Sequence, residues 1–189
     1  MTVRTSGAEV RVRPLAELTT LRVGGPAEVW TVHDDASARD ATDAPFRPIG
    51  AGSNLLVSDD GVPERVVRLG RAYNDVRAFG DAHEAWLGCA TPLPGLVRRA
   101  QRAGLSGLEG LLGVPAELGG AVVMNAGTRF GEVGEVLREV EWLRDGRIER
   151  VPAEDLGLAY RRSQVPGGAL LLRARLALTP STPERVAAA

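Results

Sequence analysis

The strongest constraint on the fold is a run of glycines between Gly104 and Gly134. These 31 residues hold nine of the chain's 23 glycines, yet Leu and Val occur among them throughout. A flexible spacer would be rich in Ser and poor in apolar side chains, so the run is not a linker. Glycine permits positive φ and lets another molecule approach the backbone closely. We therefore interpret the run as a wall against a flat ligand; the alternative is a core loop with tight turns.

Composition excludes several classes of partner. The 189 residues include 23 basic and 24 acidic ones, a net charge of −1, so the chain lacks the positive charge that nucleic-acid binding requires. No apolar run approaches the roughly 20 residues of a membrane-spanning helix, and residues 1–14 hold no signal-peptide stretch. We expect no nucleic acid and no membrane among the partners, and a cytoplasmic location.

The inventory of reactive side chains is short. Cys89 is the single cysteine, and its apolar setting predicts a buried thiol rather than a nucleophile. Every basic residue is Arg, which excludes a Schiff base and a Walker-type phosphate lysine. His33 and His83 stand far apart in turn-like segments, so we expect both on the surface and no metal site.

A second glycine loop, Gly50-Ala-Gly-Ser-Asn-Leu, lies between two short apolar segments. Successive N–H groups without bulky side chains form an anion-binding concavity, which the Ser53 hydroxyl and the Asn54 amide can extend. The loop is not the dinucleotide fingerprint Gly-x-Gly-x-x-Gly, because Leu55 replaces the third glycine and a strand-like segment follows. The alternative interpretation is a plain Gly-Ser-Asn turn.

Hydrophobic periodicity predicts a small α/β lobe followed by a larger region of helices and strands. An Asp145-Gly146 pair predicts a tight hairpin turn, and the tail after Pro180 is expected to fray. The predicted strands are 8–13, 27–32, 65–69, 75–79, 85–88, 136–144, 147–151 and 170–178, and short helices are predicted at 36–42 and 153–156.

The clearest helical pattern covers residues 92–103. Leu93, Leu96, Val97 and Ala100 fall on one face, and three arginines fall on the other. Thr91 is the predicted N-cap, Pro92 takes the first helical position, and Gly104 marks the end.

Four motifs then occur in order and carry a family resemblance. They are Thr20-Leu-Arg-Val-Gly-Gly-Pro-Ala; Gly50-Ala-Gly-Ser-Asn-Leu-Leu-Val-Ser-Asp; Gly104-Leu-Ser-Gly-Leu-Glu with Gly113-Val-Pro-Ala-Glu-Leu-Gly-Gly-Ala-Val-Val-Met-Asn-Ala-Gly; and Leu158-Ala-Tyr-Arg-Arg-Ser. Together they resemble the UDP-N-acetylenolpyruvoylglucosamine reductases, also called UDP-N-acetylmuramate dehydrogenases. The resemblance implies an α+β fold, the two-lobed FAD-binding domain of the vanillyl-alcohol-oxidase (PCMH) type. Residues 1–70 would form the small N-terminal α/β lobe, residues 71–180 the larger α+β lobe, and residues 181–189 a frayed tail.

The resemblance also implies a cofactor site between the lobes. Residues 50–55 would hold the FAD pyrophosphate, which agrees with the anion-binding loop inferred above, and residues 113–127 would line the flavin. The Asn125 amide would face the polar edge of the ring or the ribityl chain. Gly52→Val is expected to block flavin uptake without unfolding the domain. The predicted cofactor-binding residues are Gly50, Ala51, Gly52, Ser53, Asn54, Leu55, Gly113, Pro115, Gly119, Gly120, Ala121, Asn125, Ala126 and Gly127.

The resemblance implies FAD as the cofactor and NADPH as the hydride donor. We expect the FAD to be bound non-covalently, because no His or Cys lies within the matched motifs. Members of this family reduce the enolpyruvyl group of a UDP-sugar, UDP-N-acetylglucosamine enolpyruvate, to UDP-N-acetylmuramate in peptidoglycan synthesis. Tyr160 and Arg161 match the family's Tyr-Arg pair, so Tyr160 is the implied substrate-binding residue and Arg161 the implied catalytic one. A planar, permanently charged guanidinium can hold a carboxylate with two donors. The alternative is that Arg161 pairs with a surface carboxylate.

The chain also departs from the family pattern. Ala51, Ala116-Glu117 and Thr128-Arg129-Phe130 add bulk beside the expected flavin. The family's C-terminal substrate-binding domain, with its proton-donating serine and late glutamate, has no counterpart in these 189 residues. We expect either a cut-down gene product or one piece of a longer chain, whose remainder would provide that domain. This segment alone is expected to be incomplete and inactive. Two alternatives remain: a non-catalytic flavin-binding remnant, and another flavin oxidoreductase of the same fold.

Overall fold

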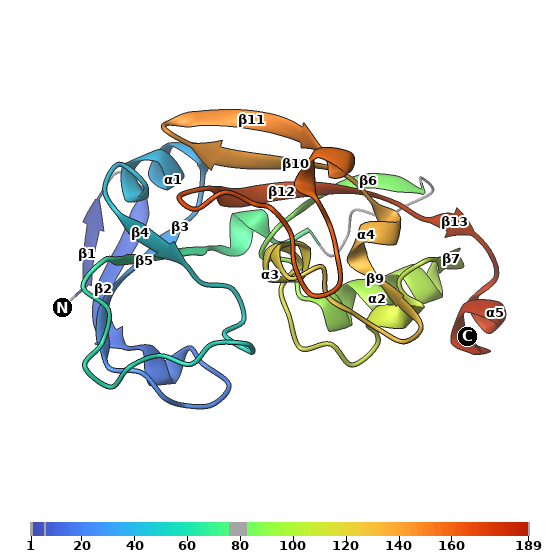
Figure 1. Cartoon of the computed structure of the whole chain (residues 1–189), viewed down its shortest axis with the longest axis horizontal. Coiled ribbons are helices and arrows are strands. Elements are labelled where there is room, and N and C mark those ends of the chain that lie inside the picture. Colours follow the sequence, from blue (N-terminus) through green and yellow to red (C-terminus); the bar gives the residue numbers. More distant parts are fainter. Residues whose placement is uncertain (1, 6, 76–82, 189) are drawn as a thin grey trace.

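The computed structural model describes residues 2–5, 7–75 and 83–188, which form two β-sheets with helices packed around them (Figure 1). The first sheet has the strand order β1-β2-β3-β5-β4. The strands β1, β2 and β3 are antiparallel neighbours, whereas β3 and β4 both run parallel to β5. Their bounds are β1 (Thr2–Thr5), β2 (Ala8–Pro14), β3 (Pro26–Val32), β4 (Phe46–Pro48) and β5 (Arg65–Leu69).

Helix α1 (Asp35–Ala41) is the crossover from β3 to β4 that the parallel arrangement requires. The Asp34 carboxylate caps it by accepting a 2.7 Å hydrogen bond from the Ser37 N–H, and the Ser37 hydroxyl accepts from the Asp34 N–H. The strands predicted at 8–13, 27–32 and 65–69 and the helix at 36–42 are confirmed to within a residue. Strand β4 was not predicted, because Pro45 and Pro48 were interpreted only as the end of the preceding helix, although proline is tolerated in an edge strand.

The second sheet is antiparallel, with the order β11-β10-β12-β6. Its hairpin turns at Asp145 and Gly146, whose φ angles of 50° and 74° give the mirror-image turn that fits strand twist. The predicted hairpin and the predicted helical turn at 153–156 are confirmed. The strand predicted at 75–79 falls outside the described residues, apart from Asp75, which is not in a strand. The bounds are β6 (Glu84–Gly88), β10 (Leu137–Arg144), β11 (Arg147–Pro152), η4 (Ala153–Leu156) and β12 (Leu170–Ala177).

Helices α2 (Leu93–Arg102), α3 (Leu118–Val123) and α4 (Val133–Val136) lie below the second sheet in Figure 1. The predicted apolar face of α2 is buried, which confirms its amphipathic pattern. The remaining elements of the described residues are short: η1 (Leu15–Glu17), η2 (Arg71–Tyr73), β7 (Leu105–Ser106), η3 (Glu109–Leu111), β8 (Gly127–Thr128), β9 (Gly131–Glu132) and β13 (Thr179–Pro180).

The start of α2 corrects the predicted cap. Pro92 is the N-cap, and no side chain bonds to the first turn. The Thr91 hydroxyl instead accepts a hydrogen bond from the Asp75 N–H at 2.9 Å. Because Thr91 is fully buried, its hydroxyl needs a partner, and a residue distant in sequence provides one. The predicted end is confirmed, since Gly104 follows the helix with a φ of 64°.

The C-terminal segment corrects the expectation of a frayed tail. Residues Pro183–Ala188 form helix α5, and Val186 is buried. The Ser181 N–H donates to the Gly104 carbonyl at 2.6 Å, and β13 pairs with β7 just before it. These contacts attach the segment to the end of α2, so the polar composition of the tail gave a misleading signal.

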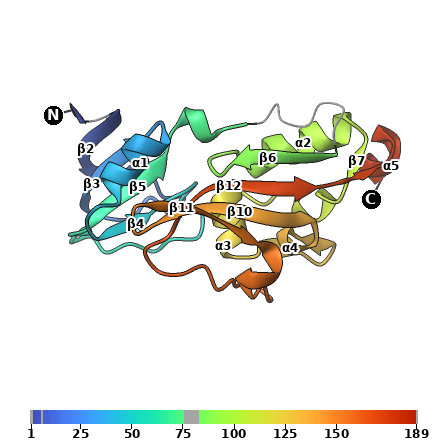
Figure 2. The same cartoon turned by 90° about the horizontal axis from the view of Figure 1, so that it is seen from above.

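One apolar core joins the two sheets. Val32 and Val67 of the first sheet belong to the same buried cluster as Leu87 and Leu172 of the second. Figure 2 shows the first sheet at one end of the molecule and the second sheet extending along it. A smaller cluster covers the other face of the first sheet and consists of Leu15, Ala27, Val29, Ile49 and Val66.

A polar contact reinforces this junction. The Asp35 carboxylate at the start of α1 accepts hydrogen bonds at 2.8 Å from the Tyr73 hydroxyl and from the Arg173 guanidinium on β12. Burial raises the Asp35 pKa, but the hydrogen bonds from Arg173 and Tyr73 lower it by more, so the net shift of the pKa is downward. The carboxylate is therefore ionised at neutral pH and holds α1 against the second sheet.

Candidate functional site

Residues 50–55 form a loop at the carboxyl end of β4. Because β4 runs parallel to β5, both strands end at the same edge of the sheet, where open α/β sheets bind ligands. Ala51, Asn54 and Leu55 are exposed. Within the described part of the chain, the N–H groups of residues 50–54 donate no hydrogen bond to any acceptor. Consecutive N–H groups without an acceptor in the protein can bind an anion.

Gly52 differs from the rest of this loop because it packs against protein. Its φ is 65°, and its carbonyl accepts a hydrogen bond from the Thr20 N–H at 3.0 Å. A Cβ atom added to Gly52 would lie 2.0 Å from the carbonyl oxygen of Leu18. The absence of a side chain therefore makes room for residues 18–20 and not for a ligand. This geometry contradicts the expectation that Gly52→Val spares the fold.

The predicted flavin wall, residues 113–127, has an open side on and before α3. A Cβ added to Gly113 or Gly120 would meet nothing within 4 Å. Pro115 is exposed between them. These three residues can contact a ligand directly. The other small residues of the segment pack against protein: Gly119 lies on Cys89, Gly127 pairs with residues 131 and 132, and Ala121 and Ala126 are buried.

The fold brings the two glycine segments together. The Asn54 side-chain nitrogen lies 3.7 Å from the Met124 sulfur at the end of α3. Glu117 directly precedes α3, and its Oε2 lies 3.4 Å from the position of a Cβ on Gly50. Segments far apart in the sequence thus form one site, located between β5 and α3 in Figure 1.

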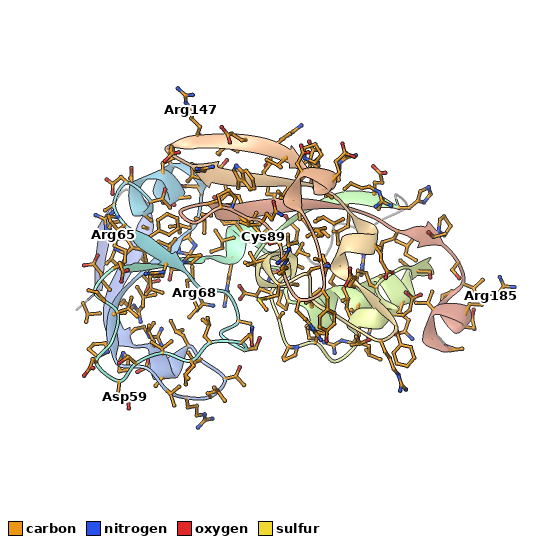
Figure 3. The ribbon with its side chains drawn as sticks, viewed as in Figure 1. Asp59, Arg65, Arg68, Cys89, Arg147 and Arg185 are labelled. Atoms are coloured by element: carbon orange, nitrogen blue, oxygen red, sulfur yellow. The ribbon has the colours of Figure 1, made fainter. Side chains whose placement is uncertain are left out.

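Two charged side chains in this region were not assigned from the sequence. Arg68 on β5 lies between β5 and α3 (Figure 3), and its Nη2 is 3.8 Å from Oε1 of Glu117. Burial raises the Glu117 pKa, and the positive charge of Arg68 opposes that rise only in part. The sequence marked Glu117 only as added bulk. The sequence signal that could have identified Arg68 as a site residue is a cationic side chain near the carboxyl end of a parallel strand.

The structure places the Asn125 amide differently from the expectation that it faces the cofactor. Asn125 is 1% exposed and has a positive φ of 39°. Its Nδ2 donates to Glu132 at 2.7 Å and to the Ala159 carbonyl at 3.2 Å, and its Oδ1 accepts from the Gly134 N–H at 2.9 Å. Both amide hydrogens are thus used inside the protein. The side chain connects the end of α3 to the turn that carries Tyr160 and Arg161.

Tyr160 and Arg161 stand at the tip of that turn. The backbones of Ala159 and Arg162 exchange two 3.0 Å hydrogen bonds, and Arg161 has a positive φ of 57°. Tyr160 is 84% exposed, and the Arg161 guanidinium lies 5.8 Å from the centre of its ring. No salt bridge to Arg161 occurs among the described residues. The alternative of a surface carboxylate partner therefore gains no support.

The remaining reactive side chains lie as the sequence predicted. Cys89 is buried, and burial raises the pKa of its thiol, so it is a neutral packing residue. His33 and His83 are exposed. Across the described residues, no three His, Cys, Asp or Glu side chains converge on a possible metal position. No helix in those residues combines the length and apolar character needed to cross a membrane.

Comparison with known proteins identifies the class. The profile of the FAD binding domain family matches residues 22–151. A structure from Physcomitrella patens, BBE-like 1, has a TM-score of 0.66 at 15% identity, over 93% of this chain and 43% of that one, which is a likeness of fold alone. The chain belongs to the FAD binding domain family, and its fold is the α+β FAD-binding fold of the vanillyl-alcohol-oxidase type.

Within this family, the chain is similar to UDP-N-acetylenolpyruvoylglucosamine reductases. A reductase from Thermus thermophilus is 51% identical over 172 residues, which are 91% of this chain and 63% of that protein. The Deinococcus radiodurans reductase is 46% identical, over 97% of this chain and 66% of that protein. The crystal structure of the Thermus caldophilus reductase has a TM-score of 0.87 at 49% identity, over 95% of this chain and 66% of that one. The chain thus spans slightly less than two thirds of these relatives, and the sequence resemblance is confirmed.

Proposed function

We propose that this chain is the FAD-binding part of an enzyme that reduces UDP-N-acetylglucosamine enolpyruvate to UDP-N-acetylmuramate in peptidoglycan synthesis, with NADPH as the hydride donor. One observation carries the cofactor assignment: the loop of residues 50–54, whose five N–H groups donate to no acceptor among the described residues, contacts the end of α3 through Asn54 and Met124. Such a site fits a ligand with an anionic centre and a flat ring. The similar reductases support the reaction and the substrate, and the cytoplasm is the compartment that provides NADPH and nucleotide sugars.

The chain's own residues take defined roles in this proposal. FAD, when bound, supplies a group that accepts a hydride and passes it on. The N–H groups of residues 50–54 bind its pyrophosphate, and Gly113, Pro115 and Gly120 lie along the flavin. Arg161, free of any salt bridge within the described residues, holds the carboxylate of the enolpyruvyl group, and Tyr160 contacts the substrate. Asn125 positions both through Ala159.

We predict that FAD binds without a covalent bond. The covalent link to a flavin needs a nucleophilic side chain such as His or Cys. Neither residue type occurs within the four motifs, and Cys89, which packs against Gly119, is buried. After FAD loading and desalting, acid precipitation should leave the flavin in the supernatant and a colourless pellet. A yellow pellet would contradict the non-covalent assignment. Failure to take up FAD even at high concentration would contradict the proposed function, with Glu117 and Arg129 as the first residues to replace.

We predict that the FAD-loaded chain alone forms no measurable UDP-N-acetylmuramate. Reduction of the enolpyruvyl double bond needs a proton as well as a hydride, and a positioned acid contributes roughly 10²- to 10⁴-fold. Arg161 keeps its proton, and the Ser163 hydroxyl donates to the Val123 carbonyl at 2.8 Å. We expect only slow NADPH oxidation, with oxygen reduced to peroxide. Mass spectrometry of the reaction mixture measures the product.

A complementation experiment distinguishes a competent FAD-binding part from a non-catalytic remnant. The last third of the Thermus thermophilus reductase, added as a separate polypeptide, should restore product formation if the chain is a competent FAD-binding part. Absence of product in that mixture, with FAD bound, would favour the non-catalytic remnant. Turnover by the chain alone would instead identify an acid within these residues, and Tyr160 and Ser163 would be the side chains to mutate.

A further inference from the structure

Arg68 is a cation without a satisfying partner at the edge of the proposed cofactor site. Its guanidinium donates no hydrogen bond to any residue in the part of the chain that the structure describes, and its side chain is 33% exposed. The nearest carboxylate is that of Glu117, at 3.8 Å, which is longer than a hydrogen bond. An Arg fork binds carboxylates and phosphates with two parallel donors, so this loose contact leaves most of its binding capacity unused.

Glu117 lies between this guanidinium and the anion-binding loop. One carboxylate oxygen faces Arg68, and the other lies 3.4 Å from the position of a Cβ on Gly50. The side chain is only 16% exposed, and no donor among the described residues hydrogen-bonds to it. A poorly hydrated carboxylate therefore occupies the space between the loop and Arg68. An anionic ligand in that space would interact favourably with both the loop N–H groups and the guanidinium.

We propose that Arg68 is a ligand of the FAD pyrophosphate and that Glu117 is its counter-ion in the cofactor-free chain, displaced when FAD binds. The inference rests on the proposed function, because it takes FAD as the ligand of the loop. Two phosphates in place of one carboxylate let the Arg fork form charge-assisted hydrogen bonds. Glu117 then lies beside the added negative charge, and its ionised form opposes cofactor binding.

This arrangement links FAD binding to a proton. The charged and titratable groups that face Glu117 are Arg68 from β5 and the Cys89 thiol, which burial keeps neutral. The pyrophosphate raises the proton affinity of Glu117 further, so the bound state holds more protons than the free state. FAD affinity should therefore rise as pH falls through the range in which Glu117 titrates in the complex.

The test is the dissociation constant of FAD, measured by quenching of flavin fluorescence between about pH 5 and pH 8. At the upper end, Glu117→Gln should bind FAD about tenfold more tightly than the unmodified chain and should lose the pH dependence. Arg68→Gln should bind FAD about tenfold or more weakly at every pH. In the double variant that combines Arg68→Gln with Glu117→Gln, the part of the gain that comes from freeing Arg68 should disappear. The part that comes from removing the negative charge beside the pyrophosphate should remain, so the two substitutions should not be additive.

The matched controls come from Arg47 on β4 and Glu64 just before β5, which form a 2.9 Å salt bridge. Arg47→Gln and Glu64→Gln change the net charge equally and should leave FAD affinity unchanged. If the unmodified chain binds FAD but Glu117→Gln neither tightens binding nor removes the pH dependence, the inference is wrong while the proposed function stands. If the unmodified chain takes up no FAD, both are wrong. A damaged fold cannot produce a gain of FAD affinity. The measurement on Glu117→Gln therefore tests the inference even if Arg68→Gln folds poorly.

Discussion

Gly120→Leu should abolish FAD uptake while the chain stays folded. A Cβ on Gly120 would meet no atom within 4 Å, so the added side chain projects into the open space on α3. Leu is also a better helix former than Gly by about 0.5–1 kcal/mol, and the free energy of unfolding should not fall. The same side chain fills the space in which a flat ring would contact the backbone. We expect the dissociation constant for FAD to rise at least about a hundredfold.

The measurement combines FAD titration with thermal unfolding of the cofactor-free chain. Gly167→Leu is the matched control, because a Cβ at Gly167 also meets nothing within 4 Å and Gly167 precedes β12, outside the two glycine segments. That variant should bind FAD normally. Unchanged FAD affinity in Gly120→Leu would show that the open side of α3 is not the flavin wall. A lowered unfolding temperature would show that Gly120 is needed for packing.

Local patterns predicted the elements whose determinants are local. The strand at 65–69 and the hairpin at Asp145-Gly146 follow from alternation and turn chemistry in adjacent residues, and the structure confirms both. The amphipathic face of α2 is another such case. The four motifs identified the family, and three of them carry glycines at positions where the backbone needs them.

The differences involve hydrogen-bond partners that the local sequence pattern does not indicate. Thr91 was predicted as a helix cap, but its hydroxyl accepts from the Asp75 N–H. Asn125 was expected to face the cofactor, but Glu132, Gly134 and Ala159 use its amide. A polar side chain in a motif needs a hydrogen-bond partner, and the sequence alone does not tell whether that partner is a ligand or the protein.

The same limit applies to charge. Glu117 was identified from the sequence as a departure that adds bulk, whereas its position depends on tertiary packing. That packing places its carboxylate beside Gly50 and within 3.8 Å of Arg68. Neither neighbour is close in sequence. Only the folded chain shows that a carboxylate and a guanidinium meet at the anion-binding loop. The expected effect of Glu117 on a bound anion is therefore electrostatic and not only steric.

Gly52→Val should destabilise the chain strongly even without cofactor. The φ of Gly52 is 65°, a region that costs a β-branched residue roughly 1–3 kcal/mol. In addition, its Cβ would lie 2.0 Å from the Leu18 carbonyl oxygen, so the backbone must move. That movement breaks the hydrogen bond from the Thr20 N–H to the Gly52 carbonyl. We expect the free energy of unfolding to fall by about 3 kcal/mol or more.

Urea unfolding of the cofactor-free variant measures this loss, and Ala51→Val is the matched control. Ala51 is the exposed neighbour of Gly52, and its φ is not positive, so the same side chain should change the unfolding midpoint little. Because FAD stabilises only the folded chain, saturating FAD should raise the midpoint of the unmodified chain far more than that of Gly52→Val. A Gly52→Val chain that unfolds normally but no longer binds FAD would place the open side of Gly52 toward the ligand. The contact with Leu18 would then not determine the turn, and the five free N–H groups would have to be oriented by another part of the loop.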